Sequence, residues 1–111
     1  LVTCLANDFC YADIYAILLQ TYAQAGDIVI AFSGSGNSPN ILNGLTAARA
    51  MGLTTIGFGG RDGGQMKALC DLVLIAPTDS MELLEDLHLI YFHNLVCAMR
   101  PALAENLGFR S

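Results

Sequence analysis

The chain has 111 residues, with 5 Lys and Arg against 10 Asp and Glu, and a formal net charge of -5 at pH 7. A chain of this size and charge forms one small acidic domain, and its negative charge disfavours binding to a nucleic acid. Only 14% of the residues are charged while 54% are hydrophobic, which excludes intrinsic disorder. A domain this small leaves much of its surface exposed, so part of that surface must be apolar, and we expect a homo-oligomer.

The cysteines and the apolar runs indicate the compartment. The four cysteines are far apart and form no Cys-x-x-Cys pair, which argues against a zinc knuckle and favours reduced thiols. The longest apolar stretch, Leu87 to Met99, is interrupted by polar residues and is shorter than the roughly 20 apolar residues that span a bilayer. We therefore expect a cytoplasmic protein without a membrane segment or a secretory signal.

The chain opens with an apolar run, Leu1 to Leu5, which predicts a buried strand. Because buried strands rarely begin a natural chain, we expect that sequence is missing upstream. The segment from Asp8 to Ala25 carries apolar residues at three- and four-residue spacing, which predicts a helix that ends at Gly26.

The next segment, Asp27 to Phe32, is almost continuously apolar and rich in β-branched residues. This pattern predicts a parallel strand that is covered on both sheet faces. After it, Ser38 offers an N-cap hydroxyl and Pro39 suits the first helical position, so we expect a helix from there to Met51.

The second half of the chain repeats the alternation. We expect strands at Thr54 to Phe58 and Leu72 to Ile75, separated by a helical turn near Gln65 to Leu69. Asp79 and Glu82 resemble a capping box that starts a long helix to about Arg100. Pro101 should end that helix, which gives one domain over residues 1–100 and a tail over 101–111.

Strands that alternate with helices in this way predict an α/β fold, with a parallel β-sheet flanked by helices on both faces. Ligands of such sheets bind beyond the carboxyl ends of the strands. The informative loops are therefore those that follow Leu5, Phe32, Phe58 and Ile75.

The strongest motif is the serine loop, Ser33-Gly34-Ser35-Gly36-Asn37-Ser38, between a strand and a proline-started helix. Glycines let a ligand approach the backbone, and hydroxyls and helix amides can donate to an oxyanion, so the loop is a candidate phosphate site. It lacks the lysine of a Walker A loop, and Pro39 stands where a Rossmann fingerprint needs glycine, which disfavours a nucleotide. The alternative is a tight turn with capping serines.

Two other loops carry polar signals. Asn7 and Asp8 could bind sugar hydroxyls, or Asp8 could be the N-cap of the next helix. The glycine turn, residues 59–64, holds Arg61 and Asp62 among four glycines, and it is either a turn near the ligand or a salt-bridged structural loop.

The long C-terminal helix places Glu85, His88 and His93 in an apolar surround. Glu85 and His93 are separated by about 80° around the helix and about 12 Å along it, so their side chains could reach one pocket and act in acid/base chemistry or bind a metal. Glu85 with His88 is the rival pair. A histidine on such a helix can equally be a hydrogen-bonded core residue.

These motifs together resemble a known family. The segment Ala6-Asn7-Asp8-Phe9, the serine loop, Gly60-Arg61-Asp62-Gly63-Gly64 and the helix from Glu85 to His93 occur in the order of SIS-domain proteins of the phosphoheptose isomerase type. The resemblance extends to about Arg100 and implies a flavodoxin-like three-layer sandwich, usually tetrameric. It implies isomerisation of sedoheptulose 7-phosphate to D-glycero-D-manno-heptose 7-phosphate with zinc at the site.

The resemblance also assigns roles to residues. It implies that Ser33, Ser35 and Ser38 bind the phosphate of the substrate. It implies that Asn7 and Asp8 contact the sugar and that His93 is the catalytic acid or base. It also implies that His93 and Glu85 bind the metal, although Glu85 could instead bind substrate. Gly34 belongs to the substrate loop but stands where the isomerases commonly have threonine, and Glu85 stands where they have glutamine.

The family's upstream half, with N-terminal helices, a first strand, an Asn-Gly-Gly turn, a further histidine and a catalytic glutamate, does not appear before Leu1. We therefore expect a partial domain that is inactive by itself. A non-catalytic SIS module that binds a phosphosugar to regulate a partner is the alternative function. A related replication-associated branch lacks the helix histidine, so the presence of His93 favours catalysis.

Overall fold

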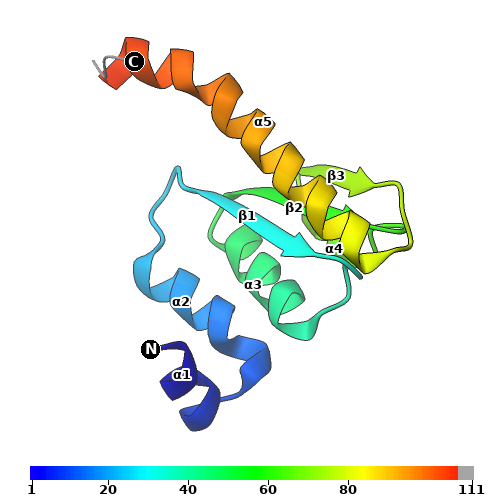
Figure 1. Cartoon of the computed structure of the whole chain (residues 1–111). Helices are drawn as coiled ribbons and strands as arrows, with labels where there is room; N and C mark the ends of the chain where they lie inside the picture. The colour runs from blue at the N-terminus through cyan, green and yellow to red at the C-terminus, as the bar shows by residue number, and fades with distance from the viewer. Residues whose placement is uncertain (108–111) are drawn as a thin grey trace.

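The computed structural model of the chain describes residues 1–107. Figure 1 shows a small sheet with helices arranged around it. The elements in chain order are α1 (Val2–Asp8), the 3-10 helix η1 (Tyr11–Asp13), α2 (Ile14–Tyr22), β1 (Ile28–Ser33), α3 (Pro39–Ala50), β2 (Thr54–Gly60), α4 (Met66–Leu69), β3 (Leu72–Ala76) and α5 (Met81–Leu107).

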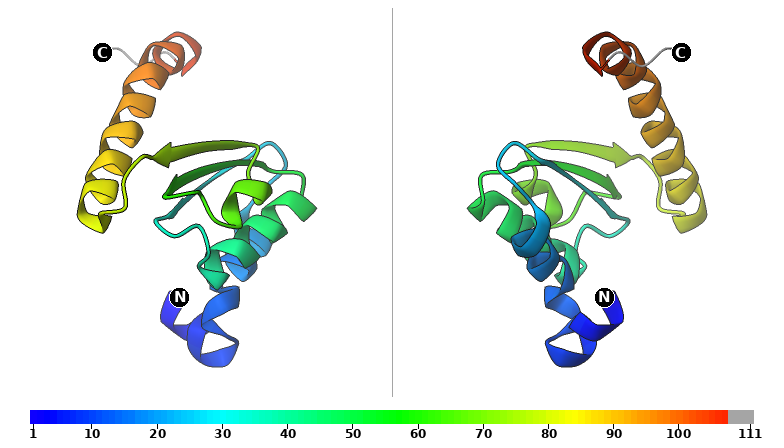
Figure 2. Two further views of the ribbon diagram at one scale, coloured as in Figure 1. Left: turned by 90° about the vertical axis from the view of Figure 1, so that its right-hand side faces the viewer. Right: turned by 90° about the vertical axis from the view of Figure 1, so that its left-hand side faces the viewer.

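The sheet has three strands in the order β1-β2-β3, and both pairs are parallel. In its register Phe32 lies opposite Phe58, which in turn lies opposite Leu74. Helices α3 and α4 connect the strands and pack on one face, whereas α5 contacts the other side of β2 and β3 (Figure 2). The expected α/β fold with a parallel sheet and helices on both faces is confirmed.

The two faces of β1 are covered unequally. Ala31 packs with Leu45 of α3 and Met66 of α4 in the core. On the opposite face Ile28 is 59% exposed and Phe32 is 44% exposed, so the expectation of cover on both faces is wrong for the described residues. The reason is the position of α5, which stands at the carboxyl ends of the strands and then rises away from the sheet (Figure 2).

The start of the chain differs from the expected strand. Residues Val2–Asp8 form α1, in which the amide of Leu5 donates to the carbonyl of Leu1 at 3.0 Å. A run of five apolar residues is compatible with either structure, and no neighbouring strand is available to it among residues 1–107. A short helix satisfies its own backbone hydrogen bonds, so it forms here.

The segment after α1 is also more broken than expected. Instead of one helix over Asp8 to Ala25, η1 and α2 follow each other, and the N-cap of α2 is Asp13. Asp8 ends α1, so its alternative role as the N-cap of the next helix is excluded.

Helix α5 begins and ends differently from the prediction. Its start is capped by Ser80, one residue after the expected Asp79: the Ser80 hydroxyl accepts the amide of Leu83 at 3.3 Å and donates to Glu82 at 2.8 Å. Pro101 lies inside the helix, which continues to Leu107. A proline removes one helical hydrogen bond, but the alanines and leucine that follow it favour a helix, so the boundary expected at residue 100 falls within α5. Residues 108–111 of the expected tail lie outside the described residues.

Candidate active site

The loops that follow the three strands line one polar cleft of about 590 Å³. The loop after β1 contributes Ser35 and Asn37, and the loop after β2 contributes Arg61 and Asp62. The loop after β3 contributes Pro77, Thr78 and Asp79. Each loop leaves the carboxyl end of its strand, which is where ligands of parallel sheets bind. This arrangement makes the cleft the candidate site. A separate hollow of about 600 Å³ between α2, α3 and β1 is lined by apolar side chains and lacks such polar groups.

The hydroxyls of the serine loop organise the loop itself. The Ser33 hydroxyl accepts the amide of Gly36 at 3.1 Å, and the Ser35 hydroxyl accepts the amide of Asn37 at 3.2 Å. An accepting hydroxyl keeps its own hydrogen for another acceptor. Ser35 lines the cleft, but Ser33 is buried, with 6% of its surface exposed. Ser35 is therefore the better placed of the two to donate to a ligand.

Ser38 stands at the N-cap of α3, as expected, but its side chain makes no capping hydrogen bond. Its half-buried hydroxyl therefore keeps its hydrogen-bonding capacity. Pro39, in the first turn of α3, has no amide hydrogen. The Ile41 amide already donates to the Ser38 carbonyl and to Asn40 Oδ1, each at 3.0 Å, so the dipole of the helix acts here rather than free amides. The start of α3 thus adds partial positive charge close to the serine loop, which favours an anion.

Gly34 faces α5 instead of offering a side chain to the cleft. A Cβ atom at this position would lie 2.9 Å from the Sδ atom of Met81 and 3.5 Å from Leu84. The first turn of α5 therefore packs directly on the serine loop. Any larger residue at position 34 would require Met81 to move.

The glycine turn lies against the same cleft. Asp62 accepts the amide of Gly64 at 3.0 Å, and Arg61 adopts a left-handed conformation with φ of 55°. Arg61 lines the cleft together with Asp62 and with Asp79 from the next loop. The cleft wall is therefore of mixed charge, and Arg61 is its cationic member.

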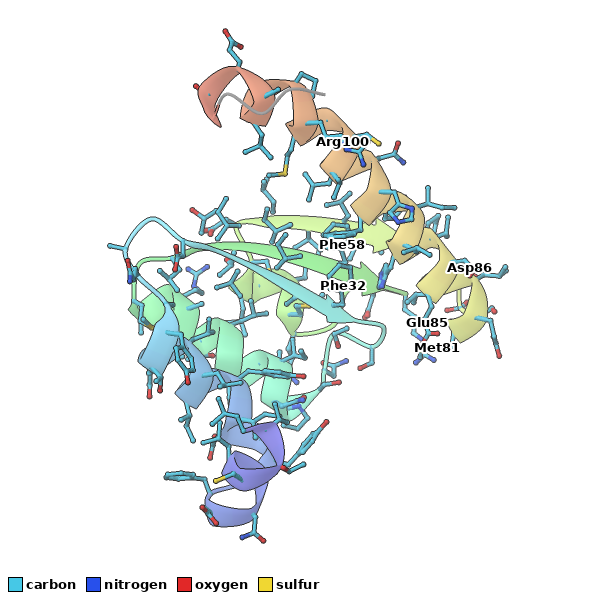
Figure 3. All side chains as sticks on the ribbon, turned by 60° about the vertical axis from the view of Figure 1, so that its left-hand side comes forward. Phe32, Phe58, Met81, Glu85, Asp86 and Arg100 are labelled. Carbon is cyan, nitrogen blue, oxygen red and sulfur yellow. The ribbon has the colours of Figure 1, made fainter. Side chains whose placement is uncertain are left out.

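Glu85 and His88 line the same hollow beside α5 but differ in burial. Glu85 is exposed and borders a hollow of about 380 Å³ together with Phe32, His88 and Phe92. Figure 3 shows Glu85 on α5 and Phe32 on β1. His88 is buried, and its Nε2 atom lies 2.9 Å from the carbonyl oxygen of Gly59. Because a carbonyl only accepts, Nε2 carries the proton and donates it. His88 is thus a hydrogen-bonded core histidine that also lines this hollow, so the structure brings the rival pair Glu85 and His88, and not Glu85 and His93, to one hollow.

His93 is exposed, two turns beyond Glu85 on α5. It does not line the hollow that Glu85 borders. Within residues 1–107, no three His, Cys, Asp or Glu side chains are grouped to hold a metal ion. A zinc site takes three or four protein ligands, so the donors described here do not fit zinc by themselves.

Asn7 and Asp8 end α1 and bond to each other. The Asn7 amide donates to Asp8 at 2.9 Å, and the Cys4 thiol donates to it at 3.3 Å. The Asn7 amide and then the Cys4 thiol lower the pKa of Asp8. Both residues are exposed, and no hydrogen bond joins them to the serine loop within the described chain. Their proposed contact with a sugar stays a prediction.

Sequence reasoning missed the residues that connect the loops. Asn37 donates to Ser35 and accepts the amide of Gln65, which lies 28 positions away in the sequence. The loop after β3 is one of the informative loops, but no signal in the sequence singles out Thr78, which lines the cleft. The position of Asn37 within the serine loop already indicated a role at the site. Its partner Gln65 could not be predicted, because the contact depends on how α3 and β2 return the chain to the same edge of the sheet.

Comparison with known proteins adds a second line of evidence. The family model described as "SIS domain" matches residues 2–60. The phosphoheptose isomerase of Bradyrhizobium sp. (strain BTAi1) is 40% identical to this chain over 107 residues. That of Fusobacterium nucleatum is 37% identical over 95 residues. The first match covers 96% of this chain but only 54% of the relative. The second covers 86% of this chain but only 49% of the relative. The chain therefore spans about half the length of the curated relatives that it matches.

Two solved structures share the fold. The phosphoheptose isomerase of Neisseria gonorrhoeae superimposes with a TM-score of 0.86 at 26% identity, over 88% of this chain and 56% of that protein. The enzyme of Francisella tularensis gives a TM-score of 0.81 at 25% identity, over 85% of this chain and 51% of that protein. The parallel sheet, the serine loop and the family match agree, and the chain belongs to the SIS-domain family.

Proposed function

We propose that this chain is the phosphate-binding part of a sugar-phosphate isomerase of the phosphoheptose isomerase type. The reaction would convert sedoheptulose 7-phosphate to D-glycero-D-manno-heptose 7-phosphate. One observation carries the proposal: all three strand-end loops meet at a cleft that the serine loop borders, in a chain 40% identical to a phosphoheptose isomerase.

The phosphate of the substrate would bind at the start of α3. Ser35 and Ser38 would donate their hydroxyl hydrogens to its oxygens, and the dipole of α3 would add partial positive charge at the start of the helix. Hydrogen bonds to a charged group contribute about 1.5–3 kcal/mol each. This end of the sugar phosphate does not react, so its binding would serve to orient the carbonyl end.

The reacting end needs groups that move a proton between the first two carbons. His93 is the candidate acid or base, because an imidazole exchanges protons near neutral pH. Glu85, close to the carboxyl end of β1, would bind the sugar or orient it. A second acid or base on the opposite side of the sugar is not identified among the described residues, and the family resemblance assigns that role to its upstream half.

Zinc belongs to the proposal in a limited form. Glu85 and His93 would supply one carboxylate and one imidazole, and the other ligands would come from residues that lie outside this chain or in another subunit. We expect zinc in the polypeptide as encoded, measured by elemental analysis. Its content should fall in a His93→Ala variant and stay unchanged in Asn94→Ala, an exposed neighbour on the same helix.

Association and location complete the proposal. The chain exposes many large apolar side chains, among them Leu89 and Ile90 of α5 at 55% and 52%. We therefore propose a homo-oligomer, with a tetramer as the expected state, to be measured by light scattering of the purified protein. All four cysteines are free thiols, which supports a cytoplasmic location. Within residues 1–107 no helix is both long and apolar enough to cross a membrane.

The activity is tested with the polypeptide as encoded, including any residues before Leu1. We expect conversion of sedoheptulose 7-phosphate by the wild type, loss of turnover in His93→Ala, and retained turnover in Asn94→Ala. Full turnover in His93→Ala would refute the role of His93. The absence of turnover in the wild type would refute the isomerase.

Binding is tested separately by calorimetry. We expect Ser35→Ala to weaken the affinity for sedoheptulose 7-phosphate about 10-fold to 100-fold, because one hydrogen bond to a charged phosphate is lost. Thr46→Ala removes an exposed hydroxyl of α3 that bonds only to the carbonyl of Leu42 and serves as the control. Binding without turnover or zinc would support the alternative, a regulatory phosphosugar-binding module.

A further inference from the structure

The serine loop and the glycine turn pack against each other through their backbones. The amide of Met66, just after the turn, donates to the carbonyl of Gly36 at 2.9 Å. A Cβ atom on Gly64 would lie 2.5 Å from the carbonyl oxygen of Ser35 and 2.7 Å from the side-chain nitrogen of Asn37. A Cβ atom on Gly36 would overlap the carbonyl of Gly63. The two segments can approach this closely only because glycines occupy the contact.

Asn37 joins the two segments through its side chain. Its Nδ2 atom donates to the carbonyl of Ser35 at 2.9 Å, within the serine loop. Its Oδ1 atom accepts the backbone amide of Gln65 at 3.1 Å and the side-chain amide of Gln65 at 3.4 Å. Asn37 therefore holds the Ser35 backbone on one side and Gln65, directly after the glycine turn, on the other.

We infer that Asn37 and Gly64 are positioning residues for the phosphate site. They hold the Ser35 backbone in place, and the Ser35 hydroxyl in turn accepts the Asn37 amide at 3.2 Å, so its hydrogen is left for an anion. Because the loop is ordered before a ligand arrives, binding does not have to supply the entropy cost of ordering it. This inference rests on the proposed function, since it concerns the same site and a phosphate monoester as its ligand.

The glycine turn thus belongs to the phosphate site although it does not contact the substrate. The glycine turn follows β2, precedes α4 and contacts the serine loop. A shift in the position of β2 or α4 should therefore also move Ser35. A residue that acts only on global stability would not single out this loop. The two roles therefore separate in measurements that report on the loop and on the whole fold independently.

Two variants break the contact from opposite sides, in the polypeptide as encoded. Asn37→Ala removes the side-chain hydrogen bonds, and Gly64→Ala pushes a methyl group against the Ser35 carbonyl. Asn43→Ala is the control for the first, because Asn43 on α3 bonds only to Asp13, at 2.8 Å. Gly52→Ala is the control for the second, because Gly52 also has positive φ, of 72°, but its Cβ would meet nothing within 4 Å.

We expect both loop variants to weaken the affinity for sedoheptulose 7-phosphate, measured by calorimetry, at least about 10-fold, which corresponds to about 1.4 kcal/mol. Their KM should rise much more than their kcat falls, because the affected end of the substrate does not react. Hydrogen exchange should accelerate at the amides of Gln65 and Met66. Each control should bind within about twofold of the wild type and show unchanged exchange at these amides.

Equal loss of affinity in the variants and their controls, or unchanged exchange at Gln65 and Met66, would overturn the inference. Should Gly64→Ala not fold, Asn37→Ala and the milder Gln65→Ala, which removes only the 3.4 Å bond, still decide it. A wild type that binds no sedoheptulose 7-phosphate would instead refute the proposed function and with it the phosphate role. Hydrogen exchange would then still report whether Asn37 holds the two segments together.

Discussion

Thr55 and Asp71 connect β2 to the start of β3 through a compact set of hydrogen bonds. Thr55 is completely buried, and its amide and hydroxyl both donate to Asp71 Oδ2, at 2.8 and 2.9 Å. The amide of Asp71 donates back to the Thr55 hydroxyl at 3.0 Å. The Thr55 amide, and then its hydroxyl, lower the pKa of Asp71 because they stabilise its charged form.

This pair predicts a loss of stability in acid. A carboxyl with a lowered pKa when folded stabilises the protein above its unfolded pKa of about 3.9, and this contribution is lost as the pH falls through the folded pKa. We expect the free energy of unfolding in urea to fall as the pH drops below about 4, and to fall less in Asp71→Asn. Asp86→Asn, at an exposed position on α5, should keep the wild-type dependence.

His88 gives a second test at the scale of one side chain. Its Nε2–H group bonds to the Gly59 carbonyl, and its ring lies edge-on to Phe32 and Phe58 at 5.8 and 6.1 Å. We expect His88→Leu to lower the free energy of unfolding by about 1–3 kcal/mol, because a buried carbonyl loses its donor. His93→Leu, at an exposed position of the same helix, should change it by less than about 0.5 kcal/mol. Equal effects of the two substitutions would contradict the structural role of His88.

Single side chains were predictable only where the signal was local. The serine loop could be recognised because its hydroxyls, glycines and Pro39 are contiguous in the sequence. The roles of His88 and His93 could not be separated, since both lie on the same apolar helix and only the approach of Gly59 distinguishes them. The burial of Ser33 was equally hidden, because it depends on which sheet face each residue of β1 occupies.

At the scale of elements, Pro101 interrupts the hydrogen bonding of α5 without ending the helix. We expect Pro101→Ala to stabilise the last turns, because it restores an amide donor and removes the clash with the carbonyl of Cys97, a change of up to about 3 kcal/mol locally. Slower hydrogen exchange at residues 102–106 would be the evidence. Global unfolding should change little, because this part of α5 extends beyond the sheet (Figure 1).

Elements with clear boundary residues, such as Gly26 before β1 and Pro39 at the start of α3, were predicted, and those without such residues were not. The three strands of the sheet and α3 appear within two residues of their expected ends. The run from Leu1 to Leu5 had no alternation and no partner strand to decide its structure, and it forms part of a helix. Helix α5 continues beyond its expected end at Arg100, because the residues on both sides of Pro101 favour a helix.

At the scale of the whole molecule, the sheet face on the side of α5 is apolar and largely uncovered. Ile28 and Leu72 are 59% and 60% exposed on this face. We expect the pair Ile28→Thr and Leu72→Thr to reduce the native mass measured by light scattering, because association would bury these side chains. Val2→Thr, at an exposed position of α1, is the control and should leave the mass unchanged. An unchanged mass in the double variant would exclude this face from the contact between subunits.

The parallel arrangement of the strands also determines how the chain can fold. Neither strand pair in residues 1–107 is joined by a tight hairpin, because α3 separates β1 from β2 and α4 separates β2 from β3. The entropy cost of closing a loop rises with its length, so the shorter connection through α4 closes at a lower cost. The pairing of β2 with β3, secured by Thr55 and Asp71, should therefore precede the addition of β1. The polar cleft would then form last, when β1 joins the sheet and brings the serine loop against the glycine turn.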